Sequence, residues 1–455
     1  MSAYKQNGKG TIYQLSLVFA ASSLCWLSFS AIAAEPLTTT PTATPLRNAA
    51  SATSISSNPA AVNIVSGTGE AQRYIDSKLG IKDTHGITIG GTWIGDGNQL
   101  FSGGIANADR TTFNSLLLLN LTVDTEKFNG WPGGLFGIEV LQLNSQNTNA
   151  QAGSVQGYNS IPGPPPLDRF QLYQLWYRQE FFDKKFILRV GKTVPTYDFG
   201  NVVKPVALDK GDPTIPAVSG LIYTPIFINP SMLGTLPGYY NSAYGITMSF
   251  APIKEWYLSY GIYDGNSASG QQTGLHATPT FNGAHFQIAE TGLAWLIGKN
   301  KLPGTIGAGI WHQHGKLKSS PPISENNATG YYLFGSQRLW YKDPGINSSG
   351  ISGFFQYGLN NSNAMLINKY AGVGLTAFGL IPKRLDDSIG VGAAYSWLDP
   401  HNFNHSNELI LQAYYQAQVI KGVYLEPALS YIPSPGANDS RNNAWAGTLR
   451  AIVLF

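Results

Sequence analysis

Charged residues are scarce in this chain of 455 residues. Asp, Glu, Lys and Arg make up 12% of it, about half of the roughly 25% usual in soluble globular proteins. The 29 basic and 26 acidic residues leave a net charge of +3, which is too small for strong electrostatic attraction to nucleic acid. Glycine and aromatic residues are abundant instead, with 51 Gly, 24 Tyr, 21 Phe and 10 Trp. This balance excludes a coiled coil, a charged disordered chain and a typical cytosolic enzyme surface. It predicts an exterior that faces something other than water.

Cysteine is almost absent, since Cys25 is the single one. It lies in an apolar, small-residue run over residues 11–34, which follows Lys5 and Lys9 and ends in Ala-Ile-Ala-Ala. That layout is typical of a signal peptide, so we expect residues 1–34 to be removed on export; a retained membrane anchor is the alternative. The mature chain then has no disulfide, thiolate metal site or thiol nucleophile.

Two further parts follow the expected signal peptide. Residues 35–66 are rich in Thr, Pro and Ala and predict a flexible spacer. Residues 67–455 form the predicted body, which begins with a short helical or extended segment around residues 71–79.

Long apolar runs are also missing from the body, because no segment past residue 86 reaches the roughly 20 apolar residues of a membrane helix. Segments of about nine to thirteen residues rich in Val, Ile, Leu, Tyr, Phe and Trp occur instead, and Gly, Pro, Asn or Asp bound each one, as is typical of strands. The predicted strands lie near 87–95, 113–124, 134–145, 170–182, 185–192, 243–251, 256–264, 285–297, 304–315, 329–342, 350–359, 368–379, 388–398, 407–419, 422–432 and 443–455.

The connections between these strands alternate between short and long. Short ones occur at 183–184, 252–255 and 420–421, and long ones at 96–112, 146–169, 193–242 and 265–284. Short turns on one rim and long loops on the other are typical of bacterial outer-membrane barrels. In lipid every backbone N–H and C=O must be paired, so a strand protein must close on itself. We therefore predict an all-β fold, a 16-stranded antiparallel transmembrane β-barrel.

Side chains alternate along the predicted strands, with Leu411 and Ala413 on one face and Gln412 and Gln416 on the other. Charged residues fall on the polar face, because an Arg or Lys facing lipid at the bilayer midplane would cost about 2–4 kcal/mol. A soluble β-sandwich also alternates, but it would carry more charge on its outer face. The residues predicted to line a water-filled lumen are Glu139, Trp176, Arg178, Glu180, Arg189, Glu290, Arg338, Glu408, Glu426 and Arg450.

These lumen residues carry both signs of charge, which argues against strong selection for simple anions or cations. Carboxylate and guanidinium groups hydrogen-bond hydroxyls, and aromatic rings pack on sugar C–H faces, so the mixture suits sugars. The alternative is that the charges only rigidify the wall. The long 193–242 connection is the predicted constriction, because loops of this length are usually functional or disordered and several prolines restrict it. Its charged residues are Asp209, Lys210 and Asp212; the proline-rich stretch at 162–166 is expected at the same mouth.

Several stretches, taken in order, resemble the OprB-type carbohydrate-selective porins. They are Leu172–Phe181 followed by Leu188–Lys192, then Tyr260–Asn266, Glu290–Trp295, Leu302–Gly304, Gly309–His312, Glu426-Pro427, Tyr431–Gly436 and Leu449-Arg450 with the final Phe455. The resemblance implies a sixteen-stranded outer-membrane barrel that passes monosaccharides, especially glucose, by facilitated diffusion. It also implies sugar contacts for Glu139, Arg178, Glu180, Arg189, Glu290 and Glu426. Single barrels and homotrimers both stay open.

Other functions have less support in the sequence. No Ser-His-acid set stands out for a barrel hydrolase, so we expect no enzyme and no cofactor. His312 and His314 share one strand face and could bind a metal as a pair, but no third ligand is evident. A general or aromatic-solute pore and a structural or adhesion barrel are the remaining alternatives. The expected partners are small carbohydrates, outer-membrane lipid and lipopolysaccharide, with no nucleic acid, and the expected location is the bacterial outer membrane.

Overall fold

The computed structural model describes residues 86–128, 130–161, 168–200, 202, 219–233, 235, 242–253, 255–265, 285–318, 324–347, 349–437 and 442–455. The expected signal peptide, spacer and early helical segment lie outside these residues. So do Asp209, Lys210 and Asp212 and the proline-rich stretch at 162–166. Within the described ranges, no helix combines the length and the apolar character needed to cross a membrane.

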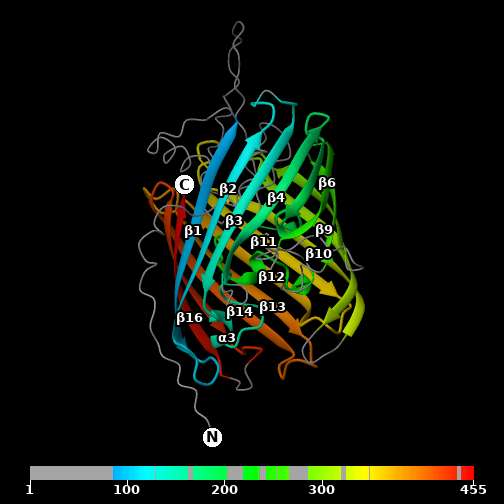
Figure 1. Cartoon of the computed structure of the whole chain (residues 1–455). Helices are drawn as coiled ribbons and strands as arrows, with labels where there is room; N and C mark the ends of the chain where they lie inside the picture. The colour runs from blue at the N-terminus through cyan, green and yellow to red at the C-terminus, as the bar shows by residue number, and fades with distance from the viewer. Residues whose placement is uncertain are drawn as a thin grey trace, which may run out of the picture.

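Sixteen strands pair with their sequence neighbours, and β1 pairs with β16, so the sheet is a closed antiparallel barrel (Figure 1). This confirms the predicted fold class. The strands are β1 (Ile87–Ser102), β2 (Thr111–Asp124), β3 (Gly134–Ser145), β4 (Arg169–Phe181), β5 (Phe186–Thr193), β6 (Ala243–Ile253), β7 (Trp256–Asp264), β8 (His285–Ile297), β9 (Leu302–Lys318), β10 (Ser324–Tyr341), β11 (Gly350–Asn360), β12 (Ile367–Phe378), β13 (Ser388–Leu398), β14 (Asn407–Ile420), β15 (Val423–Ile432) and β16 (Ala444–Leu454).

The two faces of the barrel wall follow the two-residue period of the strands. On β16, Leu449 is 51% exposed while the adjacent Arg450 is 1% exposed. The same alternation on β14 leaves Leu411 and Ala413 exposed and buries Gln412. The exposed face is apolar, and the charged and amide side chains lie on the buried face among further apolar ones, whereas a water-soluble sheet protein exposes its polar face.

The last residue closes the barrel. Gly91 N donates to the Phe455 carbonyl at 2.7 Å, and Phe455 N donates to the Gly91 carbonyl at 2.9 Å. The Phe455 ring lies over Gly91, where a Cβ atom would come within 1.9 Å of it. Only glycine leaves room for the ring at this position of β1.

The first strand is longer than the sequence predicts. β1 continues to Ser102 instead of ending at residue 95, so the long connection expected at 96–112 shrinks to residues 103–110. Gly95, Asp96 and Gly97 resemble turn residues, but all three pair with β2 and β16. Their pairing places Asp96 on the buried face.

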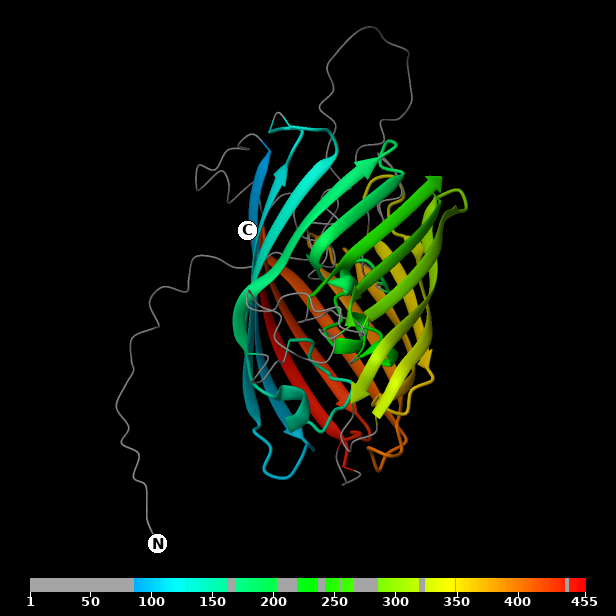
Figure 2. The same cartoon turned by 45° about the vertical axis from the view of Figure 1, so that its right-hand side comes forward.

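Long connections on one rim fold back inside the ring of strands (Figure 2). They contain the short helix α3 (Thr148–Gln151) and the 3₁₀ turns η1 (Pro195–Tyr197), η2 (Thr224–Ile226) and η3 (Pro230–Met232). The apolar side chains of these connections pack on the inner wall and form the buried core, which includes Tyr158, Phe199, Leu221 and Ile226.

Candidate lumen site

The connection between β3 and β4 folds into the lumen and reaches β14 along the inner wall. Residues 153–161, here the first inner segment, are fastened there by the Glu408 carboxylate, which is fully buried. Gly436 N, from the β15–β16 connection, donates to Glu408 at 2.7 Å. The donors from the first inner segment are Ser154 Oγ (2.9 Å), Val155 N (2.9 Å) and Gln156 N (3.0 Å). Both carboxylate oxygens of Glu408 therefore accept hydrogen bonds that hold two connections in place.

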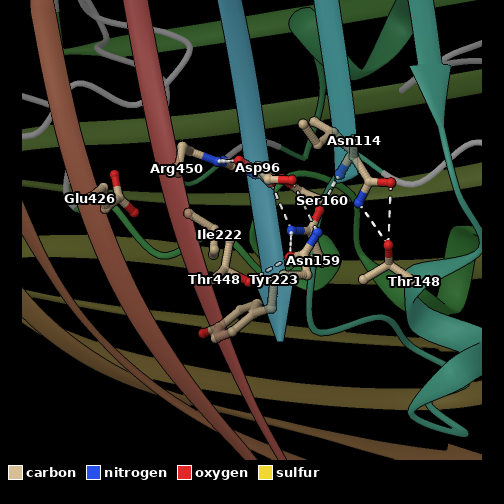
Figure 3. A network of polar contacts seen from close by, with 12 residues as sticks. Asp96, Asn114, Thr148, Asn159, Ser160, Ile222, Tyr223, Glu426, Thr448 and Arg450 are labelled. Atoms are coloured by element: carbon tan, nitrogen blue, oxygen red, sulfur yellow. Dashed lines mark hydrogen bonds and ion pairs between the residues drawn. The ribbon is translucent and has the colours of Figure 1, made fainter. Parts of the chain in front are cut away.

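A buried ion pair between β1 and β16 holds the far end of the first inner segment (Figure 3). Arg450 donates from Nε to Asp96 Oδ1 at 2.8 Å and from Nη2 to Asp96 Oδ2 at 2.7 Å. Arg450 Nη2 also donates to Ser160 Oγ at 3.0 Å, and Asn159 Nδ2 donates to Asp96 Oδ2 at 2.7 Å. Each buried charge is thus paired and hydrogen-bonded, as burial requires.

Tyr158 lies between these two anchor points. Its carbonyl accepts from Gln412 Nε2 at 2.9 Å, and its side chain is buried. Burial, and secondly the charge of Asp96, raise the pKa of the Tyr158 phenol well above its ordinary value. The phenol therefore stays neutral at physiological pH.

Residues 219–233, here the second inner segment, follow the same wall. Ile222 N and Tyr223 N both donate to Gln412 Oε1, at 2.7 and 3.1 Å. Gly220 N donates to the Tyr414 hydroxyl at 2.7 Å. Gln412 therefore fastens both inner segments, one through each end of its amide.

The two inner segments also bond to each other and extend toward β11. Thr224 N donates to the Gly157 carbonyl at 3.0 Å. Asn229 Nδ2 donates to the Tyr357 carbonyl of β11 at 3.0 Å. Together they cover the inner wall from β1 through β16 back to β11.

Glu290 of β8 fastens an earlier part of the β5–β6 connection, the same connection that contains the second inner segment. Its Oε2 accepts from Gly200 N at 2.6 Å and from the Tyr332 hydroxyl at 2.8 Å. Its Oε1 accepts from the Tyr257 hydroxyl at 2.8 Å. Like Glu408, Glu290 uses its carboxylate to position a connection that enters the lumen.

The remaining charged residues gather on β3, β4 and β5. Arg178 and Arg189 are directly opposite in the β4–β5 register, so two like charges would repel without partners. Arg178 pairs with Glu180, and Arg189 pairs with Asp198 just after η1. Glu180 also lies 3.2 Å from Lys184 Nζ. This arrangement brings alternating charges together on one stretch of wall.

Glu139 and Trp176 complete this stretch, which we call the β3–β5 cluster (Glu139, Trp176, Arg178, Glu180 and Arg189). Gln174 Nε2 donates to Glu139 Oε2 at 2.6 Å, while Glu139 Oε1 has no hydrogen-bond partner. Trp176 is buried on the same face, and its ring lies over Gly137, where a Cβ would come within 2.2 Å of it. The cluster offers a carboxylate acceptor, guanidinium donors and an aromatic face.

Two predicted lumen residues lie apart from the cluster. The Arg338 guanidinium lies 5.0 Å from the Tyr341 ring centroid and 4.9 Å from that of Phe378, which is a cation–π arrangement with each ring. Glu426 accepts from Gln416 Nε2 at 2.6 Å and lies opposite Arg450 in the register. Both side chains are buried.

Sequence reasoning missed Asp96, because its strand was expected to end one residue earlier. The two-residue period of the strand was the available signal, because it continues past residue 95. Every second residue, namely Thr92, Ile94, Asp96 and Asn98, is buried. It could not identify Gln412 as an anchor either, because the backbone groups that Gln412 binds lie far away in the sequence. No group of three or more His, Cys, Asp or Glu side chains in the described part of the chain is placed to hold a metal ion.

Comparison with known proteins identifies similar barrels. The family described as "Carbohydrate-selective porin, OprB family" matches residues 111–455. Porin B of Pseudomonas aeruginosa is 21% identical over 417 residues, which cover 80% of this chain and 86% of that protein. The solved high-pH structure of Pseudomonas putida OprB superposes with a TM-score of 0.70 at 16% identity, covering 84% of this chain and 97% of that one.

Proposed function

Since the chain belongs to the OprB family of carbohydrate-selective porins, we propose that it passes glucose-like monosaccharides through its lumen by passive diffusion. The family and the closed barrel make it a transport channel of the outer membrane. The proposal concerns the preferred solute and the residues that contact it.

The observation that carries the proposal is the division of the inward charges into two groups. Asp96, Glu290, Glu408 and Arg450 are engaged in fixing connections to the wall. Carboxylate oxygens without a hydrogen-bond partner remain on Glu139, in the β3–β5 cluster beside two guanidinium groups, and on Glu426. Sugar hydroxyls both donate and accept, so a wall of carboxylate and guanidinium groups suits them better than it suits a simple ion.

The position of the cluster supports the same solute. β4 and β12 are eight strands apart in the closed order of sixteen, so they lie on opposite sides of the lumen. The second inner segment is fastened to the wall on the β12 side, at β11 and β14. A solute passing between that segment and the cluster would meet the polar groups of the cluster and, next to them, the Trp176 ring. This combination suits a sugar ring, whose edges carry hydroxyls and whose faces carry C–H groups.

Liposome swelling tests this function. Liposomes containing the folded barrel should swell faster in isotonic glucose than in sucrose or an amino acid. Glu139→Gln and Arg178→Gln should each lower the glucose rate by roughly tenfold, because a hydrogen bond to a charged group contributes about 1.5–3 kcal/mol.

Glu325→Gln is the matched control, since its carboxylate accepts from Ser362 Oγ and Asn363 N in a connection at the rim. It should leave the glucose rate unchanged. Equal swelling in every solute would indicate a general pore, and unchanged rates in both cluster variants would remove these residues from the solute path.

A further inference from the structure

The outer face of the barrel carries histidines at the rim of the long connections. His285 is the first residue of β8, and His314 lies directly opposite it in the register with β9. Both lie on the face opposite the buried Phe286 and Gln313. Their imidazole ring centroids are 5.0 Å apart, at an interplanar angle of 31°. The structure therefore places His314 beside His285, which lies 29 positions earlier, and the sequence alone does not indicate that the two are neighbours.

This spacing is the one that a shared metal ion requires. With metal–nitrogen distances of about 2.0–2.1 Å, two imidazoles on one tetrahedral ion have ring centroids roughly 5 Å apart. His314 is exposed and His285 is half-buried, so an ion could reach both rings from outside the barrel.

The neighbouring strand orients one of the rings. His314 Nδ1 lies 2.8 Å from Asn327 Oδ1 on β10. An amide oxygen only accepts, so Nδ1 carries the proton and Nε2 has a lone pair available for a metal. Such a bond from the second ring nitrogen is found on almost every metal-binding histidine, where it fixes the tautomer and the ring direction.

We infer that His285 and His314 form a binding site for a late first-row divalent metal ion such as Zn²⁺, Ni²⁺ or Cu²⁺. Imidazole nitrogen suits these ions rather than Mg²⁺ or Ca²⁺, which take oxygen ligands. Since no third His, Cys, Asp or Glu among the described residues joins the pair, water completes the coordination. This site is independent of the proposed solute path, because it lies on the opposite face of the wall.

Calorimetric titration of the metal-free, detergent-folded barrel with Zn²⁺ tests this site. The full chain should bind one ion, and either His285→Ala or His314→Ala should abolish that binding. Asn327→Ala should weaken it by about 10- to 100-fold, as removal of an outer-shell partner does.

Two other histidines serve as controls. His401 has a carboxylate neighbour, since its Nδ1 lies 2.9 Å from Asp399 Oδ1, and its side chain is 62% exposed. Because it is distant in the chain from His285 and His314, His401→Ala should bind Zn²⁺ as the unchanged protein does. His312 follows next on the same face and lies 2.8 Å from Thr329 Oγ1, and His312→Ala should also keep the ion.

A spectroscopic readout keeps the test independent of affinity. Electron paramagnetic resonance with bound Cu²⁺ should show two coordinating nitrogens in the full chain, and this two-nitrogen signal should be lost in His314→Gln. The inference is overturned if no Zn²⁺ binds, if binding survives both alanine variants, or if it depends on His312 rather than His285. Unchanged heat-modifiable migration of each variant establishes that the barrel is folded.

Discussion

At the scale of single residues, the inward charges differ in what they bind. Glu408 accepts four hydrogen bonds from two connections, and Arg450 is paired with Asp96 through two. Glu139 keeps a carboxylate oxygen without a partner. A charge with all its hydrogen bonds made inside the protein has none left for a solute, which is why we propose the β3–β5 cluster, with its partnerless Glu139 oxygen, as the place of sugar contact.

Asp96→Ala should destabilise the barrel strongly, because it leaves the Arg450 guanidinium buried without its partner. Breaking a buried ion pair by removing one member costs about 3–5 kcal/mol. Urea unfolding followed by tryptophan fluorescence in liposomes measures the free energy of unfolding. Lys184→Gln is the matched control, because Lys184 pairs with Glu180 and its side chain is 37% exposed. Loss of this exposed pair should lower the free energy of unfolding by less than about 1 kcal/mol. A similar small loss for both variants would contradict the importance of the Asp96–Arg450 pair.

At the scale of elements, we expect the inner segments to narrow the lumen only while their anchors hold. In Glu408→Gln one oxygen becomes an NH₂ group, which faces backbone N–H donors and cannot accept from them. We expect the first inner segment to loosen, so that sucrose passes nearly as fast as glucose in swelling assays. Glu325→Gln, whose connection lies at the rim, should keep the preference for glucose. Retained discrimination in Glu408→Gln would show that this segment does not set the size limit.

The fit of Phe455 over Gly91 adds to the pairing of β1 with β16 that closes the barrel. Gly91→Ala adds a methyl group where the ring lies, and overpacking of this kind costs about 1–3 kcal/mol. The temperature at which the folded band is lost on heat-modifiability gels should fall. Gly97→Ala on the same strand has nothing within 4 Å of the added Cβ and should not change it. Equal melting of the two variants would mean that the terminal ring does not support closure.

The strands could be predicted from the sequence because membrane thickness fixes their length and the two-residue period fixes their faces. The end of β1 could not, since Gly95-Asp96-Gly97 has the composition of a turn and becomes strand only through pairing with β16. The sequence also does not reveal which inward charges anchor connections and which form the β3–β5 cluster. Glu408 and Ser154 are 254 residues apart, so no local pattern reveals that they meet.

At the scale of the whole molecule, the chain places its apolar face outward and its polar face inward around a closed ring of sixteen strands. This explains the low content of charged residues, because the outer wall meets lipid and only the lumen and rims meet water. We propose that the inner segments and the β3–β5 cluster determine which solutes pass. The same strands thus supply the outward apolar residues of the exterior and the inward residues of the lumen.

Single-channel recording in a planar bilayer tests the central claim, a lumen that admits monosaccharides. The purified barrel should give stable conductance steps, and added glucose should reduce the current in a concentration-dependent way by occupying the pore. Sucrose at the same concentration should reduce it less. A barrel that inserts and conducts while glucose leaves its current no more affected than sucrose does would contradict the account.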